Sequence, residues 1–358
     1  MLNYLREKLY AKYRLARQSW HTKNSNFKKY KFNHLDLEYR TYGNKNASNF
    51  FYVIKRAPGA GFFSNLNFVI HHLLICDDLK MIPVIDMQNY QTFYNCKNKI
   101  NNSLNSWNYY FKPVSKYSLE EVYSSKNVII CDNKTSAKGG FSNKNYISEF
   151  KYLNGFEYLD HRHKKITKKY IKINEDIIAE AENISKKLKK NKVLGICFRG
   201  SDQKKSAYQP YTPTEKQMVY ATELLLKKYN LNKIYLCTED SDYLNFYKKN
   251  YNNVLFNPNS IRTTDKKDLF DGNEKNHRYK IGRGQLIDML VLSKTNFLLF
   301  APSNIPEAAT FFANHQIPKA IIDNGMKGNI FVSQFSWYLR KSLPTFLGGF
   351  KNKIKEIK

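Results

Sequence analysis

The chain has 358 residues, which is long for one ordinary α/β domain and comfortable for two. Hydrophobic residues make up 42%, enough to build packed cores, so a wholly disordered chain is excluded. Lysine and arginine outnumber the acids by 59 to 30, and the formal charge of +29 favours anionic partners: nucleic acid, acidic lipid or phosphorylated substrates. A codon bias towards Lys, Asn, Ile and Tyr accounts for part of this charge equally well.

The residues from 1 to 35 mix basic side chains with Tyr, Leu and Trp20. A helix here would place Leu2, Leu5 and Leu9 on one side and basic residues elsewhere, which is the chemistry of a peripheral membrane anchor. An ordinary amphipathic helix packed on the protein is the alternative. Charged residues interrupt positions 1–17 throughout, so no signal peptide is predicted there. The sequence also has no apolar run of about 18 residues. We expect a soluble, cytoplasmic protein, resting at most on the inner face of the membrane.

The five cysteines show no C-x-x-C spacing and their number is odd, so neither a disulfide framework nor a zinc site is predicted. The eight histidines show no ligand spacing either. We expect reduced thiols, mostly in the core.

The first half of the chain contains one βαβ pattern. An apolar strand at 50–54 is followed by a glycine loop at 58–65, a helix at 66–79 and a second strand at 82–86. A further short strand is predicted at 128–131. We assign 1–170 to an N-terminal domain, with the charge-dense stretch 161–172 as an interdomain linker.

The second half alternates strands and helices, which predicts a doubly wound parallel sheet. Strands are predicted at 193–198, 233–237, 253–256, 296–300 and 320–323, and helices at 175–190, 214–229, 243–251, 284–294 and 303–314. The polar stretch 257–281 is predicted to be a long loop beside the active site. We assign 171–330 to a C-terminal Rossmann-like domain and 331–358 to a C-terminal helix and basic tail. The predicted fold class is α/β, with two Rossmann-like domains facing a cleft.

Polar side chains follow three of these strands, at the edge where such sheets bind ligands. The three segments are Arg199-Gly200-Ser201-Asp202, Thr238-Glu239-Asp240 and Ala301-Pro302-Ser303-Asn304. Arginine offers paired donors to phosphate oxygens, and a helix start at Ser303 offers free N–H groups and the positive end of a dipole. Carboxylates bind ribose hydroxyls or guanine N–H groups. Together these loops suit a nucleoside diphosphate.

The same segments resemble the motifs of the α1,6-, α1,2- and protein O-fucosyltransferase superfamily. Residues 195–202 resemble its HxRxxD motif, 234–240 its "ATD[DE]" strand end, and 286–293 with 297–304 its third motif. The order and spacing of the three agree over about residues 190–315. The loop Gly59–Asn65 is similar in position to the family's N-terminal glycine loop. Two positions depart: Cys197 stands where the motif has His, and Gln203 where Lys is frequent, with Lys204 and Lys205 beside it.

The resemblance implies a two-domain, GT-B type enzyme that transfers fucose from GDP-fucose without a metal. It implies that Arg199 binds the β-phosphate and stabilises the leaving GDP, that Asp288 hydrogen-bonds guanine, and that Ser303 contacts phosphate. The remaining expected donor-site residues are Cys197, Asp202, Thr238, Glu239, Asp240, Arg283 and Asn304. In the first domain, Gly59, Gly61, Ser64 and Asn65 would face the sugar and the acceptor.

Inverting transfer passes through an oxocarbenium-like state while negative charge builds on the departing diphosphate, so a fixed cation is needed where no metal serves. A general base is also needed for the acceptor hydroxyl. Asp86, after the strand at 82–85, is a candidate by position, and a turn or cap role is the alternative. Asp240-Ser241-Asp242 forms a D-x-D that in another glycosyltransferase fold holds a divalent metal; we expect no metal here, with Asp242 as a helix-start acid.

Two further alternatives stay open. The same fold with another donor, such as GDP-mannose or a UDP-sugar, is one. A basic, Tyr-rich protein that binds nucleic acid is the other, although the sequence carries no recognised nucleic-acid-binding motif and we expect no nucleic-acid partner. Within the enzyme hypothesis, the expected acceptor is a glycan or lipid-linked glycan of surface polysaccharide, such as lipopolysaccharide or capsule.

Overall fold

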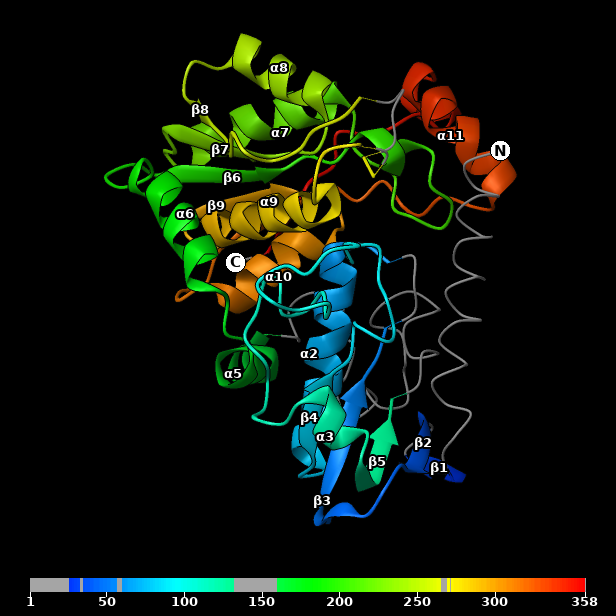
Figure 1. Ribbon diagram of the computed structural model, residues 1–358. Coiled ribbons are helices and arrows are strands. Elements are labelled where there is room, and N and C mark those ends of the chain that lie inside the picture. Colours follow the sequence, from blue (N-terminus) through cyan, green and yellow to red (C-terminus); the bar gives the residue numbers. More distant parts are fainter. Residues whose placement is uncertain are drawn as a thin grey trace. The chain divides into compact units, whose positions relative to one another are not determined.

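The computed structural model describes residues 26–32, 35–56, 60–131, 160–264, 269–270 and 272–357 (Figure 1). The chain divides into two compact units, Met1–Asn174 and Glu175–Lys358. The helix predicted near the N-terminus and the loop residue Gly59 lie outside the described residues. Within the described parts of the chain, no helix combines the length and apolar character needed to cross a bilayer.

The first unit is built on a five-stranded sheet of order β1-β2-β5-β3-β4. Its elements are β1 (Asn26–Phe32), β2 (Leu35–Thr41), β3 (Lys45–Ile54), α2 (Phe62–Asp78), β4 (Ile82–Ile85), α3 (Leu119–Val122), β5 (Ser125–Ile130) and α5 (Asp160–Tyr170). Strand β3 lies between β5 and β4 and runs parallel to both, and its parallel pairing with β4 is the one that the βαβ pattern predicted. Its apolar end is fully buried because Phe51 and Val53 pack with Val84, Val128 and Ile130.

The stretch predicted as an interdomain linker is instead a helix of the first unit. Helix α5 packs along α2, and its cations pair with the acids at the end of α2: Arg162 with Asp78 at 2.6 Å and Lys169 with Asp77. These ion pairs link the two helices at their exposed edge. The charge density of 161–172 is therefore the polar side of a packed helix.

The second unit is built on a six-stranded sheet of order β11-β10-β9-β6-β7-β8, parallel except for β11. Its elements are α6 (Glu175–Lys186), β6 (Val193–Cys197), η1 (Ser201–Lys204), α7 (Glu215–Lys228), β7 (Lys233–Cys237), α8 (Ser241–Asn250), β8 (Val254–Leu255), α9 (His277–Leu292), β9 (Phe297–Phe300), α10 (Asn304–Phe312), β10 (Lys319–Ile321), α11 (Ile330–Ser342), η2 (Thr345–Leu347) and β11 (Lys355–Ile357). Helices α7 and α8 cover one face, and α9 and α10 the other (Figure 1).

The parallel order and the alternation of strands and helices confirm the predicted α/β class. Strand β7 has the predicted bounds, and Thr214 caps α7 through a reciprocal pair of bonds with Gln217. Several boundaries differ. Helix α2 begins at Phe62, four residues before the predicted start at 66, and α6 ends at Lys186, four residues before the predicted end at 190. Helix α9 begins at His277, seven residues before the expected Gly284. The C-terminal tail does not stand apart, because β11 adds to the edge strand β10.

Candidate active site

The sheet of the second unit has its topological switch point between β6 and β9. The chain runs from β6 outward through β7 to β8, and then returns to place β9 on the other side of β6. Loops leaving two neighbouring strands in opposite directions form a crevice, which is where open parallel sheets bind ligands. The segments after β6 and β9 are those that begin at Phe198 and Ala301.

Arg199 follows β6 at this point. Its Nε lies 3.5 Å from Oε1 of Glu239, the residue two positions after β7, and the Gly200 N–H donates to the same oxygen at 3.0 Å. The Arg199 side chain keeps 30% of its surface exposed, whereas that of Glu239 keeps 9%. Glu239 thus orients a guanidinium that remains accessible from solvent.

A second cation lies beside the first. Lys204, from η1, places Nζ 3.6 Å from Oδ2 of Asp240, and both side chains are buried. The other oxygen, Oδ1, caps α8 by accepting from the N–H groups of Asp242 and Tyr243. Since Lys204 already supplies the positive charge at Asp240, this D-x-D is used as a helix cap. Among the described residues, no cluster of three or more His, Cys, Asp or Glu side chains is arranged to hold a metal ion.

The β9 loop supplies a helix N-terminus. Ser303 is the N-cap of α10, yet its side chain makes no cap bond, and its buried Oγ has no hydrogen-bond partner among the described residues. Asn304 is the first helical residue and is half-buried. An N-terminus whose cap hydroxyl is left unused is suited to accept an anion, because the first N–H groups and the dipole favour negative charge.

The other predicted residues of these loops have supporting positions. Thr238 is buried and accepts from the Asp240 N–H at 3.1 Å, which shapes the turn. Cys197 and Cys237 are register partners at the ends of β6 and β7, and the contact between their thiols, with burial, raises the pKa of Cys237. Asp202 lies in η1.

Asp288, expected to bind guanine, is 3% exposed on α9. Its two oxygens accept from the hydroxyls of Tyr235 on β7 and Ser260, each at 2.6 Å. Burial raises its pKa to about 6, against the two hydroxyl bonds. Ser260 belongs to the long loop predicted beside the site, and this loop reaches it: the Thr263 N–H donates to the Glu239 carbonyl at 2.8 Å. Asp288 therefore fastens the loop to the sheet.

Arg283 is not part of this group of residues. Its guanidinium pairs with Glu180 and, at 3.2 Å, with Asp176, both on the neighbouring helix α6. The assignment of Arg283 to the nucleotide site is thus corrected: its donors are used in packing α6 against α9.

In the first unit, the glycine loop leads into α2, and two predicted residues there bind an arginine that the sequence analysis missed. Arg56 donates from Nε to Asn65 Oδ1 at 3.1 Å and from Nη2 to Ser64 Oγ at 2.9 Å. It is 5% exposed and lies over the Phe68 ring, and burial lowers its pKa to about 10. Gly61 is the exposed N-cap of α2, with open space around it.

Asp86 is fully buried and all its acceptor positions are used. Oδ1 accepts from the N–H groups of Gln88 and Asn89, and Oδ2 accepts from the Asn89 amide and, at 2.7 Å, from the Tyr123 hydroxyl. A carboxylate that closes its own turn and never meets solvent does not reach an acceptor hydroxyl. The general-base assignment of Asp86 is corrected to the turn role.

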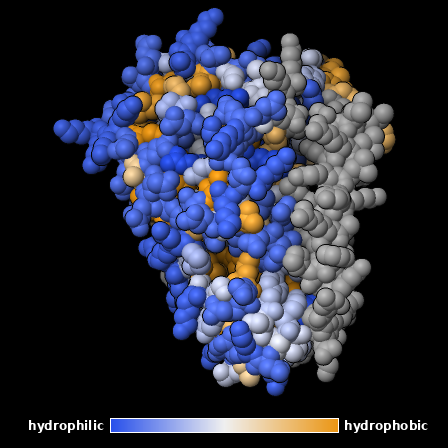
Figure 2. All heavy atoms as spheres, in the orientation of Figure 1, coloured by the Kyte–Doolittle hydropathy of each residue, from blue (hydrophilic) through white to orange (hydrophobic). Residues whose placement is uncertain are grey.

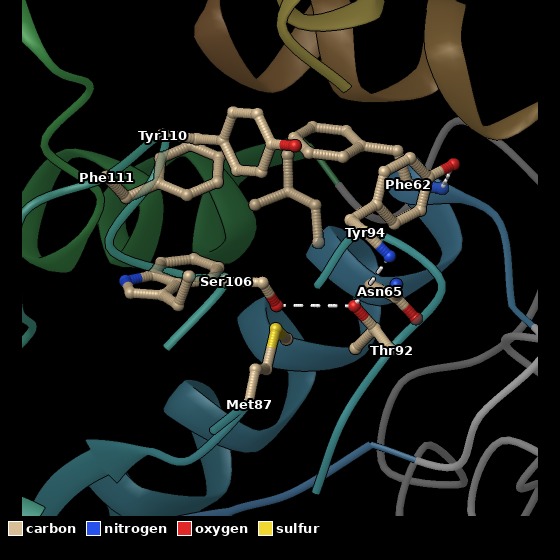
Figure 3. Close-up of a pocket in the computed structure, with 10 residues that line it drawn as sticks. Phe62, Asn65, Met87, Thr92, Tyr94, Ser106, Tyr110 and Phe111 are labelled. Carbon is tan, nitrogen blue, oxygen red and sulfur yellow. Dashed lines mark hydrogen bonds between the residues drawn. The ribbon is translucent and has the colours of Figure 1, made fainter. Parts of the chain in front are cut away.

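An aromatic cavity borders the start of α2 (Figure 3). It is lined by Phe62, Asn65, Leu66, Met87, Thr92, Tyr94, Ser106, Trp107, Tyr110 and Phe111. Two bonds drawn in the figure close its polar side: the Phe62 N–H donates to the Tyr94 hydroxyl at 2.8 Å, and the hydroxyls of Thr92 and Ser106 are 3.3 Å apart. Its volume of about 20 Å³ is room for roughly one water molecule. In this structure the cavity is too small for a sugar, and the bond from Phe62 to Tyr94 ties the start of α2 to its wall.

No protein-family model matches the chain, and no curated protein matches it in sequence. Among solved structures, the chain is similar to the fucosyltransferase NodZ from Bradyrhizobium, with 15% identity and a TM-score of 0.47 over 77% of this chain and 97% of that one. With NodZ α1,6-fucosyltransferase soaked with GDP-fucose, the identity is 16% and the TM-score 0.45, over 76% of this chain and 94% of that one. With POFUT1 in complex with GDP-fucose, the identity is 10% and the TM-score 0.38, over 78% of this chain and 99% of that one. These TM-scores all lie below 0.5, so the similarity does not assign a function to this chain.

Proposed function

We propose that this protein is a glycosyltransferase that transfers fucose from GDP-fucose to a glycan acceptor, with inversion and without a metal. The observation that carries the proposal is the placement of Arg199: an accessible guanidinium, oriented by Glu239, at the switch point of a parallel sheet. The motif resemblance of residues 195–202 selects fucose and GDP among the nucleotide sugars.

In the proposed reaction, the bond between the sugar C1 and the β-phosphate oxygen breaks while the acceptor oxygen bonds to C1 and loses its proton to a base. Negative charge grows on the diphosphate. Arg199 binds it from the β6 side, and the α10 N-terminus with the Ser303 hydroxyl binds it from the β9 side. A fixed cation of this kind commonly contributes on the order of 10²–10³ in rate.

Base recognition is assigned to the loop that Asp288 fastens. The turn of Thr238 and Glu239 borders the phosphate loops, and the long loop joins it at Thr263. These residues are therefore suited to bind the ribose and guanine. In the first unit, Gly61 and the exposed start of α2 serve the sugar and acceptor side, while Ser64 and Asn65 shape that loop through Arg56.

The acceptor is proposed to be a lipid-linked surface-polysaccharide precursor, such as that of lipopolysaccharide or capsule, at the cytoplasmic face of the membrane. The strongly basic composition supports a partner carrying pyrophosphate or lying on an acidic surface. This part of the proposal rests on charge, and the donor site does not depend on it.

The test is a thermal-stability screen of the whole protein with GDP, GDP-fucose, GDP-mannose and UDP. A ligand present at about 100 times its dissociation constant adds about 2.7 kcal/mol to the stability of the folded state, which is readily measured as a higher unfolding temperature. We expect GDP and GDP-fucose to stabilise the protein, and Arg199→Ala to remove the effect and to lower transfer at least ~10²-fold.

Arg162→Ala is the matched control, because Arg162 forms an exposed ion pair of the first unit. Its nucleotide response should equal that of the wild type. Full transfer by Arg199→Ala would refute the proposed role. Stabilisation by UDP alone would keep the fold and change the donor, and steeply salt-dependent binding of RNA without any nucleotide response would favour the nucleic-acid alternative.

A further inference from the structure

Helix α11 buries its polar side and exposes its apolar side. Ser333 and Ser336 are at most 5% exposed, and the Trp337 indole N–H donates to the Thr212 carbonyl at 2.8 Å. On the opposite side, Phe331 is 78% exposed, Phe335 56% and Leu339 53%. Their spacing of four residues forms one stripe along the helix. A surface helix that only covers the core of a globular protein has its apolar side buried and its polar side exposed.

The apolar surface continues beyond the helix. The turn η2 carries Phe346 and Leu347, exposed by 83% and 58%. Met326, just before the helix, is 62% exposed, and Tyr208, whose N–H donates to Gly328, is 69% exposed. Figure 2 shows hydrophobic atoms, in orange, near the position of α11 towards the upper right. Such a gathering of large exposed side chains is typical of an interaction surface. We call this surface the α11 face; it consists of Tyr208, Met326, Phe331, Phe335, Leu339, Phe346 and Leu347.

The chain segment that carries α11 and η2 is rich in cations, of which Lys341 pairs with Glu215 of α7 at 2.9 Å and Lys327 is buried. From Asn324 to Lys355 the sequence contains no acid, and it contains Lys327, Arg340, Lys341, Lys351, Lys353 and Lys355. Lys351, Lys353 and Lys355 are exposed. An apolar stripe followed in the chain by exposed lysines is complementary to a surface that is apolar inside and anionic at its edge.

We propose that the α11 face docks the protein on a bilayer that contains acidic phospholipid. The aromatic and aliphatic side chains would enter the boundary between headgroups and acyl chains, and the lysines would meet the lipid phosphates. A second copy of the chain fits less well, because a two-fold interface on this face would bring the same cations together. The inference uses no property of the donor site.

The test is sedimentation of the full-length protein with vesicles, either of phosphatidylcholine alone or with one third phosphatidylglycerol. We expect binding to the acidic vesicles at least ~10-fold stronger than to the neutral ones. The triple variant Phe331→Gln, Phe335→Gln, Leu339→Gln should weaken binding by at least ~10-fold, because it removes the apolar contacts. The matched control is Tyr220→Gln with Leu224→Gln on α7, exposed by 45% and 38%, and it should bind as the wild type does.

The charge contribution is tested separately. Lys351→Gln with Lys353→Gln should lower binding to acidic vesicles by about fivefold for each lysine, whereas Lys248→Gln with Lys249→Gln on α8 should not. A Phe346→Trp variant reports insertion directly, because bromine atoms on the acyl chains should quench its fluorescence.

Three results would overturn the proposal. One is unchanged vesicle binding by the triple variant, with loss of binding only when Arg6, Lys8 and Lys12 are changed to Gln. A second is equal binding to neutral and acidic vesicles. A third is a dimer, observed by sedimentation without vesicles, that the triple variant converts to monomers. All variants should keep the wild-type response to GDP, so failure here is distinguishable from failure of the proposed function.

Discussion

The two units place an arginine at corresponding points and use it differently. Arg56 lies two residues after β3 and Arg199 two residues after β6, and each strand has parallel neighbours on both sides in its own sheet. Arg56 is 5% exposed and donates to the first turn of α2, which starts at Phe62. Arg199 keeps a 30% exposed side chain, and the next α-helix starts only at Glu215. The topology sets the position of each arginine, and only the one close to a following α-helix is buried against that helix.

The buried titratable groups differ as well. In the first unit, burial lowers the pKa of His72 to about 3, assisted by Arg56, and holds the pKa of His71 well below its usual range. In the second unit, burial raises the pKa of Glu307 to about 8, against the pull of Lys319, and that of Asp288 to about 6. His71 and His72 are thus buried neutral bases and Glu307 is a buried neutral acid, so acid should weaken the first unit and alkali the second.

The largest expected effect is at Glu307. Its folded pKa is raised above the unfolded value of 4.5, so the folded state holds the extra proton and loses stability as the pH rises towards 8. At 1.36 kcal/mol per unit, this amounts to roughly 5 kcal/mol. Glu307→Gln should match the wild type at pH 5 and exceed it by several kcal/mol at pH 9, measured by urea unfolding. Parallel pH profiles for the two proteins would contradict the burial of a neutral acid.

Arg56→Ala should cost the first unit about 3 kcal/mol, because it leaves the buried Asn65 oxygen without its donor and opens a cavity beside Phe68. Hydrogen exchange, followed by mass spectrometry, should show faster opening of peptides from β3 and α2, with peptides from β6 and β7 unchanged. Arg162→Ala, at an exposed ion pair of the same unit, is the control and should change little. Equal exchange in both variants would show that the buried guanidinium does not hold the helix.

The part of this comparison that could be predicted from sequence is the second unit. Its apolar strands are short and regularly spaced, so the loops of Arg199, Glu239 and Ser303 could be assigned to one edge of the sheet before any coordinates. The first unit is harder because its partners are distant. Asp86 closes a turn by accepting hydrogen bonds from Asn89, and it also accepts one from the Tyr123 hydroxyl. No local sequence pattern indicates the contact with Tyr123. The charged stretch at 161–172 was not recognised as a packed helix, because the acids that pair with its cations lie far away in the sequence, on α2.

Arg283 shows the same limit within the second unit. It was expected among the donor-site residues, but its partners Asp176 and Glu180 lie about a hundred positions earlier in the chain, on α6. Motif spacing locates residues along the chain and does not reveal which neighbouring element takes up their charge. The α11 face was missed for a related reason, since apolar residues on a helix are normally expected to face inward.

His72 gives the intermediate effect. Its folded pKa lies below the unfolded value of 6.5, so the unfolded state takes up the proton first and stability is lost as the pH falls below about 6.5. By pH 5 the loss is roughly 2 kcal/mol. In the wild type, exchange of first-unit peptides should quicken between pH 6.5 and 5, after correction for the intrinsic rate. His72→Gln should reduce this slope, while a slope that is the same in both proteins would assign the acid sensitivity to other groups.

The smallest effect on stability is expected at Arg199, and it is the sharpest test of the comparison. Arg199→Ala removes an ion pair at 3.5 Å from a partly exposed side chain, and Glu239 keeps its bond from the Gly200 N–H, so the cost without nucleotide should be smaller than that of Arg56→Ala. Urea unfolding of the variant measures it directly, with Arg56→Ala as the contrasting case. A cost comparable to that of Arg56→Ala would make Arg199 a second structural arginine. A small cost combined with loss of the nucleotide response would separate the arginine that builds its unit from the one that serves a ligand.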